Sequence, residues 1–361
     1  MPSAVQMRAF VVGLKHWPAP LMDMEMIQYH PTTLAGNGIL ITEGARGEGA
    51  HLYNAVGERF MEKYAPNKLE LASRDVVSRA EQTEINEGRG FPDGTVSLDI
   101  TKVPRKRTLE ALREIVNIWR DFAGVDITRE PIHIRPGCHY IMGGVKTDVW
   151  GATSIPGLYA AGEVACVSVH GGNRLGANSL LDTLIFGRRS GEHAAARGEG
   201  LAMPRVSDAS LRDEQAAIAQ ILRREPGGRR ISEIKDELGT MMNEKVAVFR
   251  DEDGLTQAHA TIRRLKEEAS VAAIDDRGTV FNPDVLGAIE LSYMLDVAEC
   301  IVVGALERRE SRGAQFRLDF PRRNDEEWLK HITLSANGGG VPTISYAPVV
   351  MTQWEPQERT Y

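Results

Sequence analysis

A short stretch rich in glycine and asparagine, residues 169–182 (VHGGNRLGANSLLD), constrains this chain more than any other feature. It follows residues 157–161, which are typical of a short buried strand, and it leads into a helix expected over about residues 179–196. Small residues allow the backbone to approach a bound molecule closely. Arg174, placed among them, therefore either faces water on an ordinary turn or is directed at an anion.

Hydrophobic periodicity predicts helices on both sides of this stretch. Apolar residues recur every three or four positions over 108–123, where Thr108 is placed to cap the helix and Gly124 to end it. Residues 207–312 are rich in charged helix formers, with breaks at 226–228 and around 277–278. Three or four helices in an antiparallel bundle are expected there, the longest near 284–310.

Composition excludes several classes of protein. A formal net charge of −7 argues against a nucleic-acid partner. The three cysteines have no CxxC spacing, which argues against a disulfide framework and a cysteine-ligated metal site. No apolar run approaches the roughly 20 residues of a membrane span, so we expect a cytoplasmic protein.

Four further stretches concentrate residues that bind anions or move protons. They are QYHPTT with His30, TEGARGEG with Glu43 and Arg46, SRDVVSR with Arg74, and CHYIMGG with His139. Each also has an ordinary structural explanation, such as a buried histidine, a solvated charged turn or a surface ion pair. The glycines of the second stretch predict a tight loop that holds Glu43 and Arg46 close enough to pair.

Seven segments follow one another in the order HPTT, TEGARGEG, SRDVVSR, CHYIMGG, GLYAAGE, SVHGGNRLGANSLLD and RRESRGAQFRLDFP. This series resembles the flavoprotein subunit of succinate dehydrogenase and its fumarate reductase relatives, from about residue 20 through at least residue 331. The resemblance implies a mixed α+β and α/β architecture. After an irregular leader at 1–20 we expect an α+β capping domain at 21–138, the C-terminal part of an FAD-binding α/β domain at 139–206, an antiparallel helical bundle at 207–315 and a C-terminal segment at 316–361.

The same resemblance assigns the substrate-binding residues. His30, Thr42, His139 and Arg174 are expected to hold the carboxylates of succinate or fumarate, with Glu43 in the same wall of the site. A guanidinium can bind a carboxylate through two parallel hydrogen bonds, and imidazoles add single bonds.

Proton transfer is assigned in the same way. Arg74 takes the position of the residue that exchanges a proton with the substrate carbon, and Glu43 and Arg46 match the groups that relay this proton to solvent. A carbon-bound hydrogen is a very weak acid, so a transiently neutral arginine suits it better than a carboxylate. His139 is the competing candidate for the base, and Arg74 is preferred because its match includes the relay.

Glu163, Asn178, Ser179 and Leu180 match flavin-contacting positions, which makes FAD the expected cofactor. The implied activity is oxidation of succinate to fumarate, with electrons passed to an iron–sulfur subunit and then to quinone. Membrane anchor subunits would be contacted indirectly, so the chain would lie peripherally on the inner face of the cell membrane.

One part of the family pattern is missing. No GxGxxG segment occurs in the 361 residues, and the likeness begins abruptly near residue 20. The chain therefore resembles the C-terminal three-fifths of a full flavoprotein, and we expect it to bind FAD weakly or not at all by itself. Gln315 also stands where many relatives have a histidine. A fumarate reductase, an L-aspartate oxidase and a non-enzymatic fragment or split-gene half are the alternative interpretations.

Overall fold

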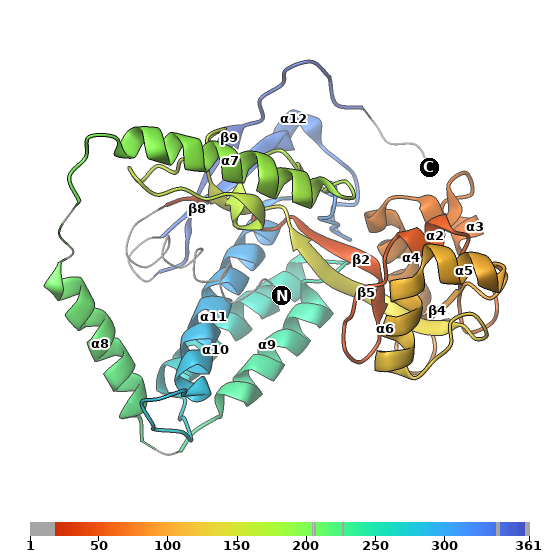
Figure 1. Ribbon diagram of the computed structural model, residues 1–361, viewed down its shortest axis with the longest axis horizontal. Helices are drawn as coiled ribbons and strands as arrows, with labels where there is room; N and C mark the ends of the chain where they lie inside the picture. The colour runs from red at the N-terminus through yellow and green to blue at the C-terminus, as the bar shows by residue number, and fades with distance from the viewer. Residues whose placement is uncertain (1–18, 204, 206, 226, 337–339, 358–361) are drawn as a thin grey trace. The chain divides into compact units, whose positions relative to one another are not determined.

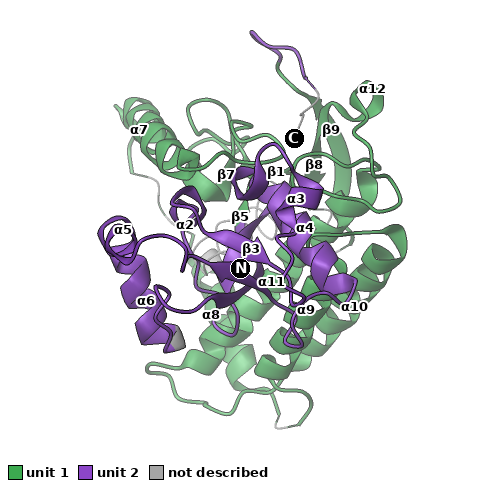
Figure 2. Cartoon of the chain, turned by 90° about the vertical axis from the view of Figure 1, so that its right-hand side faces the viewer, with its two compact units in different colours: residues 1–27, 140–350 green, residues 28–139, 351–361 purple. Residues whose placement is uncertain are grey.

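The computed structural model describes residues 19–203, 205, 207–225, 227–336 and 340–357. It divides into two compact units, which Figure 2 colours separately. Unit 1 comprises residues 1–27 and 140–350, and unit 2 comprises residues 28–139 and 351–361. The chain passes from unit 1 to unit 2 after Ile27 and returns to unit 1 after His139. Most of the expected leader, residues 1–18, lies outside the described residues.

Unit 2 is built on a four-stranded sheet in the order β2-β5-β4-β3, in which β4 pairs antiparallel with both of its neighbours. Short helices and turns surround the sheet, and Trp119, Leu52 and Ile134 are fully buried in its core. The strands are β2 (Ile27–Leu34), β3 (His51–Tyr53), β4 (Val96–Asp99) and β5 (Ile132–Ile141). The helices are α2 (Gly44–Gly47), α3 (Met61–Tyr64), the 3-10 helix η1 (Leu69–Leu71), α4 (Arg74–Asn86), α5 (Arg105–Ala111) and α6 (Arg113–Ala123).

The helix expected over 108–123 is two helices, α5 and α6. Leu112 separates them because its backbone leaves the helical region (φ −127°, ψ 31°) while its side chain enters the core. Thr108 lies inside α5 and is buried, so its predicted role as a cap is wrong. Gly124 does end α6, in the left-handed conformation at φ 68°.

Unit 1 contains a five-stranded sheet in the order β7-β6-β1-β8-β9, in which only β6 and β7 run parallel. Its strands are β1 (Leu21–Met22), β6 (Gly144–Lys146), β7 (Ala165–Cys166), β8 (Lys330–Ser335) and β9 (Thr343–Pro348). The strand expected at 157–161 is not formed: Tyr159 makes a single bridge to Ala152. The reason is that Gly157 and Gly162, at φ 91° and 76°, turn the chain at both ends of the segment. The 3-10 helix η2 (Gly162–Val164) leads from there into β7.

Helices form the rest of unit 1 (Figure 1). They are α7 (Asn178–Gly198), α8 (Asp208–Leu222), α9 (Ile231–Lys245), α10 (Glu252–Val271), α11 (Pro283–Glu307) and α12 (Asp325–Trp328). The expected helices between 207 and 312 are confirmed, and α11 is the longest of them. It packs against α9 and α10, and its C-terminal half is apolar and buried. No helix of the described residues is long and apolar enough to cross a membrane.

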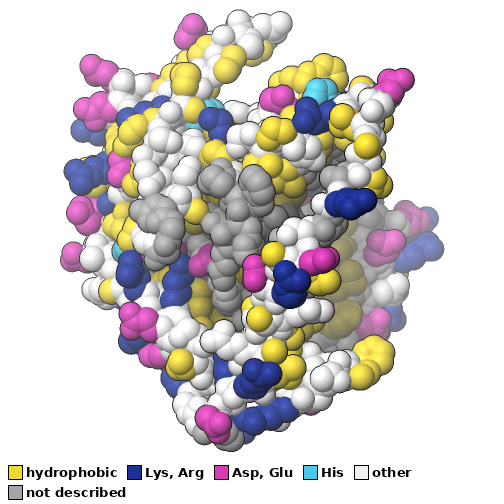
Figure 3. All heavy atoms as spheres, turned by 90° about the vertical axis from the view of Figure 1, so that its left-hand side faces the viewer, with side chains coloured by type: hydrophobic (Ala, Val, Ile, Leu, Met, Phe, Trp, Pro, Cys, Tyr) yellow, Lys and Arg dark blue, Asp and Glu magenta, His cyan; other side chains and the backbone are white. Residues whose placement is uncertain are grey.

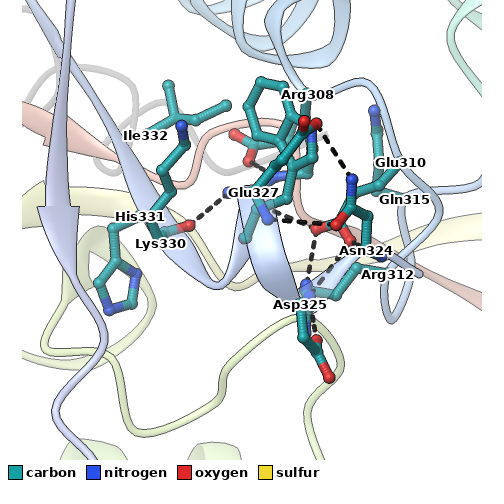
Figure 4. A network of polar contacts seen from close by, with 12 residues as sticks. Arg308, Glu310, Arg312, Gln315, Asn324, Asp325, Glu327, Lys330, His331 and Ile332 are labelled. Atoms are coloured by element: carbon teal, nitrogen blue, oxygen red, sulfur yellow. Dashed lines mark hydrogen bonds and ion pairs between the residues drawn. The ribbon is translucent and has the colours of Figure 1, made fainter.

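A buried network of charges joins distant parts of unit 1 (Figure 4). Arg308 donates Nε to Glu25 at 2.7 Å and Nη1 to Glu310 at 3.1 Å. Arg312 then links Glu310 to Asp325, with both distances 2.6 Å. Because all three carboxylates have basic partners, the network offsets the cost of burying charge.

The surface of unit 1 mixes apolar and charged side chains. On the side where α8 lies in Figure 1, Figure 3 shows hydrophobic groups scattered among basic and acidic ones. The first turns of α7 expose four large apolar residues, each about half or more accessible: Leu180, Leu181, Leu184 and Ile185.

Candidate active site

Arg74 begins helix α4 and is held by two polar side chains of unit 2. Its Nη2 and Nε donate to the same oxygen of Glu43 at 3.0 and 3.2 Å, and its Nη1 donates to Gln28 at 2.9 Å. The arginine side chain is 12% exposed, whereas that of Glu43 is 45% exposed. The arrangement keeps a guanidinium in a fixed orientation next to a carboxylate that water can reach.

Ser73 lies immediately before α4, at its N-cap position. Its hydroxyl donates to the Asp75 carboxylate at 2.6 Å. Asp75 in turn accepts from Arg79, one helical turn further on, at 3.0 Å. These bonds stabilise the first turn of the helix that carries Arg74.

The close pair expected between Glu43 and Arg46 is replaced by the pair of Glu43 with Arg74. The single turn of α2 directs Arg46 into the protein, where the residue is 2% exposed, and leaves Glu43 near the surface. Arg46 donates Nη1 to the backbone carbonyl of Glu70. Burial lowers the pKa of Arg46, and the nearby charge of Glu43 opposes this shift. Glu43 therefore acts on Arg46 through its charge.

Two histidines of unit 2 lie against each other. The rings of His30 and His139 are 5.1 Å apart and nearly perpendicular. Nδ1 of His30 accepts from the backbone N–H of Thr32 at 3.2 Å, so the neutral ring carries its proton on Nε2. This leaves His30 with a single N–H donor suited to an oxygen ligand.

Thr42, the fourth member of the expected set in unit 2, lies at the start of α2. Its hydroxyl accepts from the backbone N–H of Gly44 at 3.3 Å. The hydroxyl proton remains available to an acceptor such as a carboxylate.

Arg174 is buried in unit 1 and does not face water, since it is only 4% exposed. Its guanidinium lies 4.4 Å from the centre of the Tyr140 ring. One nitrogen, Nη1, donates to the backbone carbonyl of Leu175 at 3.1 Å. The bland explanation of the glycine-rich stretch, a solvated arginine, is therefore wrong.

The four residues expected to contact a flavin are also in unit 1. Asn178, Ser179 and Leu180 form the first turn of α7, which starts after Ala177 in the left-handed conformation at φ 64°. Glu163 lies in η2, and its carboxylate accepts from the backbone N–H of Ile141 at 3.1 Å.

Two known protein families match two separate parts of this chain. A family of FAD-binding domains matches residues 13–180, and the family described as fumarate reductase flavoprotein C-terminal matches residues 235–361. The fumarate reductase flavoprotein subunit of Mycobacterium tuberculosis is 42% identical over 95% of this chain and 62% of the relative. The succinate dehydrogenase flavoprotein subunit of Rickettsia conorii is 41% identical over 92% of this chain and 58% of the relative.

The chain belongs to the family of succinate dehydrogenase and fumarate reductase flavoprotein subunits. Among solved structures, E. coli quinol fumarate reductase matches with a TM-score of 0.90 and 36% identity, covering 98% of this chain and 63% of that one. The chain thus spans about three-fifths of the length of the relatives it matches. The mixed α and β fold expected from the sequence is confirmed.

Two residues of this flavoprotein were not singled out from the sequence, although each contacts a predicted site residue. Gln28 orients Arg74, and Tyr140 lies under Arg174. A signal for Gln28 was present, because it precedes His30 by two positions in a strand and so lies on the same face. Tyr140 follows His139 directly, and spacing gave no indication that it would meet Arg174.

Gln315, where the resemblance led us to expect a histidine, is fully buried in unit 1. Its side-chain oxygen accepts from Arg250, and its amide donates to the carbonyl of Ala305 at 3.2 Å. The glutamine thus satisfies both a donor and an acceptor in the interior.

Proposed function

We propose that this chain carries the dicarboxylate-binding and proton-transfer residues of a flavin-dependent succinate dehydrogenase, which also runs in the direction of fumarate reduction. The observation that carries the proposal is Arg74, which is fixed by Glu43 and Gln28 at the start of α4. The names of the relatives, which include both fumarate reductases and succinate dehydrogenases, agree with it.

In the proposed reaction, Arg174, His30, Thr42 and His139 hold the two substrate carboxylates. Arg174 enters with its orientation already restricted by the Tyr140 ring and by the Leu175 carbonyl. Substrate binding therefore costs less side-chain conformational entropy at Arg174 than it would at an exposed arginine.

Arg74 exchanges the proton with the substrate carbon. A guanidinium gives up a proton only when a nearby base accepts it. The Glu43 carboxylate, 3.0 Å from Nη2 of Arg74, is placed to be this base. In succinate oxidation the carbon-bound proton moves to Arg74 as Arg74 passes one to Glu43. In fumarate reduction the same steps run backwards, because one site must serve both directions. Bound flavin would supply the other half of the chemistry by exchanging a hydride with the neighbouring carbon.

The residues present fit the flavin ring of FAD. In the first turn of α7 the backbone N–H groups of Asn178 and Leu180 donate to the carbonyls of Leu175 and Ala177. The polar side chains of Asn178 and Ser179 can hydrogen-bond a flavin carbonyl, while Leu180, which is 69% exposed, covers part of the ring. Weak binding of FAD by the isolated chain remains our expectation, and quenching of flavin fluorescence on titration measures it.

The proposed electron acceptor is an iron–sulfur subunit, with membrane anchor subunits reached through it. This partnership places the chain peripherally at the inner face of the cell membrane. Copurification of the chain with such a subunit from its native host would test the assignment.

The decisive experiment compares wild type with Arg74→Lys. The purified chain, with FAD added in excess, is assayed with succinate and a dye and with fumarate and reduced viologen. We expect the variant to lose roughly 10²- to 10⁴-fold in turnover, because lysine cannot maintain two bonds to Glu43 and one to Gln28.

Dicarboxylate affinity should change far less in this variant, since Arg74 acts on the reacting carbon. Arg188→Lys serves as the matched control, because Arg188 is an exposed arginine paired within α7 to Glu192. Unchanged turnover in Arg74→Lys would contradict the proposal. Reduction of the flavin by aspartate in place of succinate would favour L-aspartate oxidase.

A further inference from the structure

Helix α4 carries a second ionisable residue in line with Arg74. Glu81 follows Arg74 by seven positions, so two helical turns place both residues on one face of α4. Glu81 is fully buried, and neither carboxylate oxygen has a hydrogen-bond partner among the described residues. A buried carboxylate without partners is costly, so the group is stabilised by taking up a proton.

The charged residue that affects the pKa of Glu81 is Arg46 of helix α2. Arg46 is 2% exposed, and its Nε and Nη2 also lack hydrogen-bond partners within the described part of the chain. The two charges act on each other: Arg46 lowers the pKa of Glu81, and Glu81 raises that of Arg46. Together they present four buried polar atoms without hydrogen-bond partners among the described residues.

Other ionisable groups near α4 are engaged elsewhere. From α3, Tyr64 donates to Glu84 at 2.6 Å and Lys63 lies 3.9 Å from the same carboxylate. Glu70 of η1 pairs with Arg59 at 2.6 Å, and Asp99 of β4 accepts from Thr101 at 2.7 Å.

Burial is therefore the main influence on Glu81, and it raises the pKa of this carboxyl well above its usual value. Arg46 is the one basic group that opposes the shift, within the described residues.

We propose that Glu81 stores a proton at neutral pH and forms the inner end of the relay that runs from Arg74 through Glu43 and Arg46. The role of the relay rests on the proposed function, whereas the stored proton does not. During fumarate reduction one proton leaves Glu81, each relay residue passes one proton on, and Arg74 gives one to the substrate carbon. Solvent then restores the proton on Glu81. During succinate oxidation Glu81 first releases its stored proton to solvent, and the resulting carboxylate accepts the proton that Arg46 passes on.

The stored proton is tested first, on the chain without FAD, by thermal unfolding of wild type and Glu81→Gln from pH 4 to pH 8. The unfolded chain releases the Glu81 proton near the usual pKa of about 4.3, whereas the folded chain keeps it to higher pH. The stored proton stabilises the folded chain fully at pH values below the pKa of Glu81 in the unfolded chain. This stabilisation is lost as pH rises through the pKa of Glu81 in the folded chain. Wild type should therefore lose stability relative to Glu81→Gln as pH rises.

Glu84→Gln is the matched control, because Glu84 is also buried on α4 but is held by Arg89, Asn54 and Tyr64. These bonds lower the pKa of Glu84 to about 2. The contribution of Glu84 to stability is complete above about pH 4.3 and disappears only as pH falls towards 2, so the stability difference for this control should stay nearly constant between pH 4 and pH 8. Infrared difference spectra between wild type and Glu81→Gln at pH 7 should also show a protonated carboxyl band.

The relay is tested by measuring turnover across pH with FAD in excess. Glu81→Gln should lower turnover by about tenfold and remove one ionisation from the pH profile, while Glu81→Asp restores both in part and Glu84→Gln keeps the wild-type profile. Glu81→Met replaces the glutamine variant if that fails to fold. A stability difference that does not vary with pH, or no carboxyl band, would overturn the stored proton. If the carboxyl band is present but Glu81→Gln leaves the pH profile of turnover unchanged, Glu81 is not part of the relay. The proton would then pass from Glu43 directly to water.

Discussion

Tyr140 restricts the orientation of Arg174, the residue that we propose binds a substrate carboxylate. The Tyr140 ring lies 4.4 Å below the guanidinium, and its hydroxyl donates to Asp182 at 3.3 Å. Burial and the charge of Asp182 raise the pKa of Tyr140, so the hydroxyl stays a donor at any ordinary pH. Tyr140 is thus a fixed platform for the arginine that we assign to the substrate carboxylate.

Replacement of Tyr140 by leucine should weaken fumarate binding by roughly twofold to thirtyfold, the range of a lost cation–π contact of about 0.5–2 kcal/mol. Tyr140→Phe keeps the ring and loses only the bond to Asp182, so its effect should be smaller. Isothermal titration of the purified variants with fumarate measures both. Tyr159→Phe, which loses a similar bond to His193, is the control. Equal affinity in Tyr140→Leu and wild type would show that Arg174 needs no platform.

At the scale of the element, a glycine stabilises the end of a helix in the left-handed conformation but destabilises the middle of a helix. Gly124 ends α6 at φ 68°, a conformation that costs alanine about 1 kcal/mol. Gly239 lies inside α9, with nothing within 4 Å of the position of an added Cβ atom.

Gly124→Ala should therefore lower the free energy of unfolding by about 1 kcal/mol, and Gly239→Ala should raise it by roughly 0.5–1 kcal/mol. Urea denaturation followed by circular dichroism compares the two variants with wild type. Stabilisation by both substitutions would mean that the end of α6 does not need the left-handed residue.

At the scale of the whole molecule, Arg308 joins segments that lie 283 residues apart in the sequence, because it pairs with Glu25 from the start of unit 1. Burial raises the pKa of Glu25, and Arg308 opposes this shift. The two residues therefore depend on each other for remaining charged in the interior.

Arg308→Met should destabilise unit 1 by about 3–5 kcal/mol, because Glu25 and Glu310 lose a partner that compensates their burial. Arg188→Met, which breaks an exposed pair within α7, should leave stability unchanged. Chemical denaturation monitored by tryptophan fluorescence tests both. A loss as small in Arg308→Met as in Arg188→Met would contradict the structural importance of the network.

Local signals were sufficient for several elements. The end of α6 at Gly124 and the long helix α11 both follow from signals carried by residues that are adjacent in the chain. The strand expected at 157–161 failed, because the positive φ angles of Gly157 and Gly162 outweigh the apolar residues between them.

The sequence by itself determined the family, the mixed α and β composition and the set of residues expected to hold a dicarboxylate, because ordered motifs are local and specific. Only the tertiary structure decided which of those residues touch. It gave Arg74 to Glu43, turned Arg46 inward and placed Tyr140 beneath Arg174. Burial and pairing depend on segments far apart in the chain, and spacing within a motif carries no record of them. For the same reason Glu81 became visible only when the fold had removed it from water.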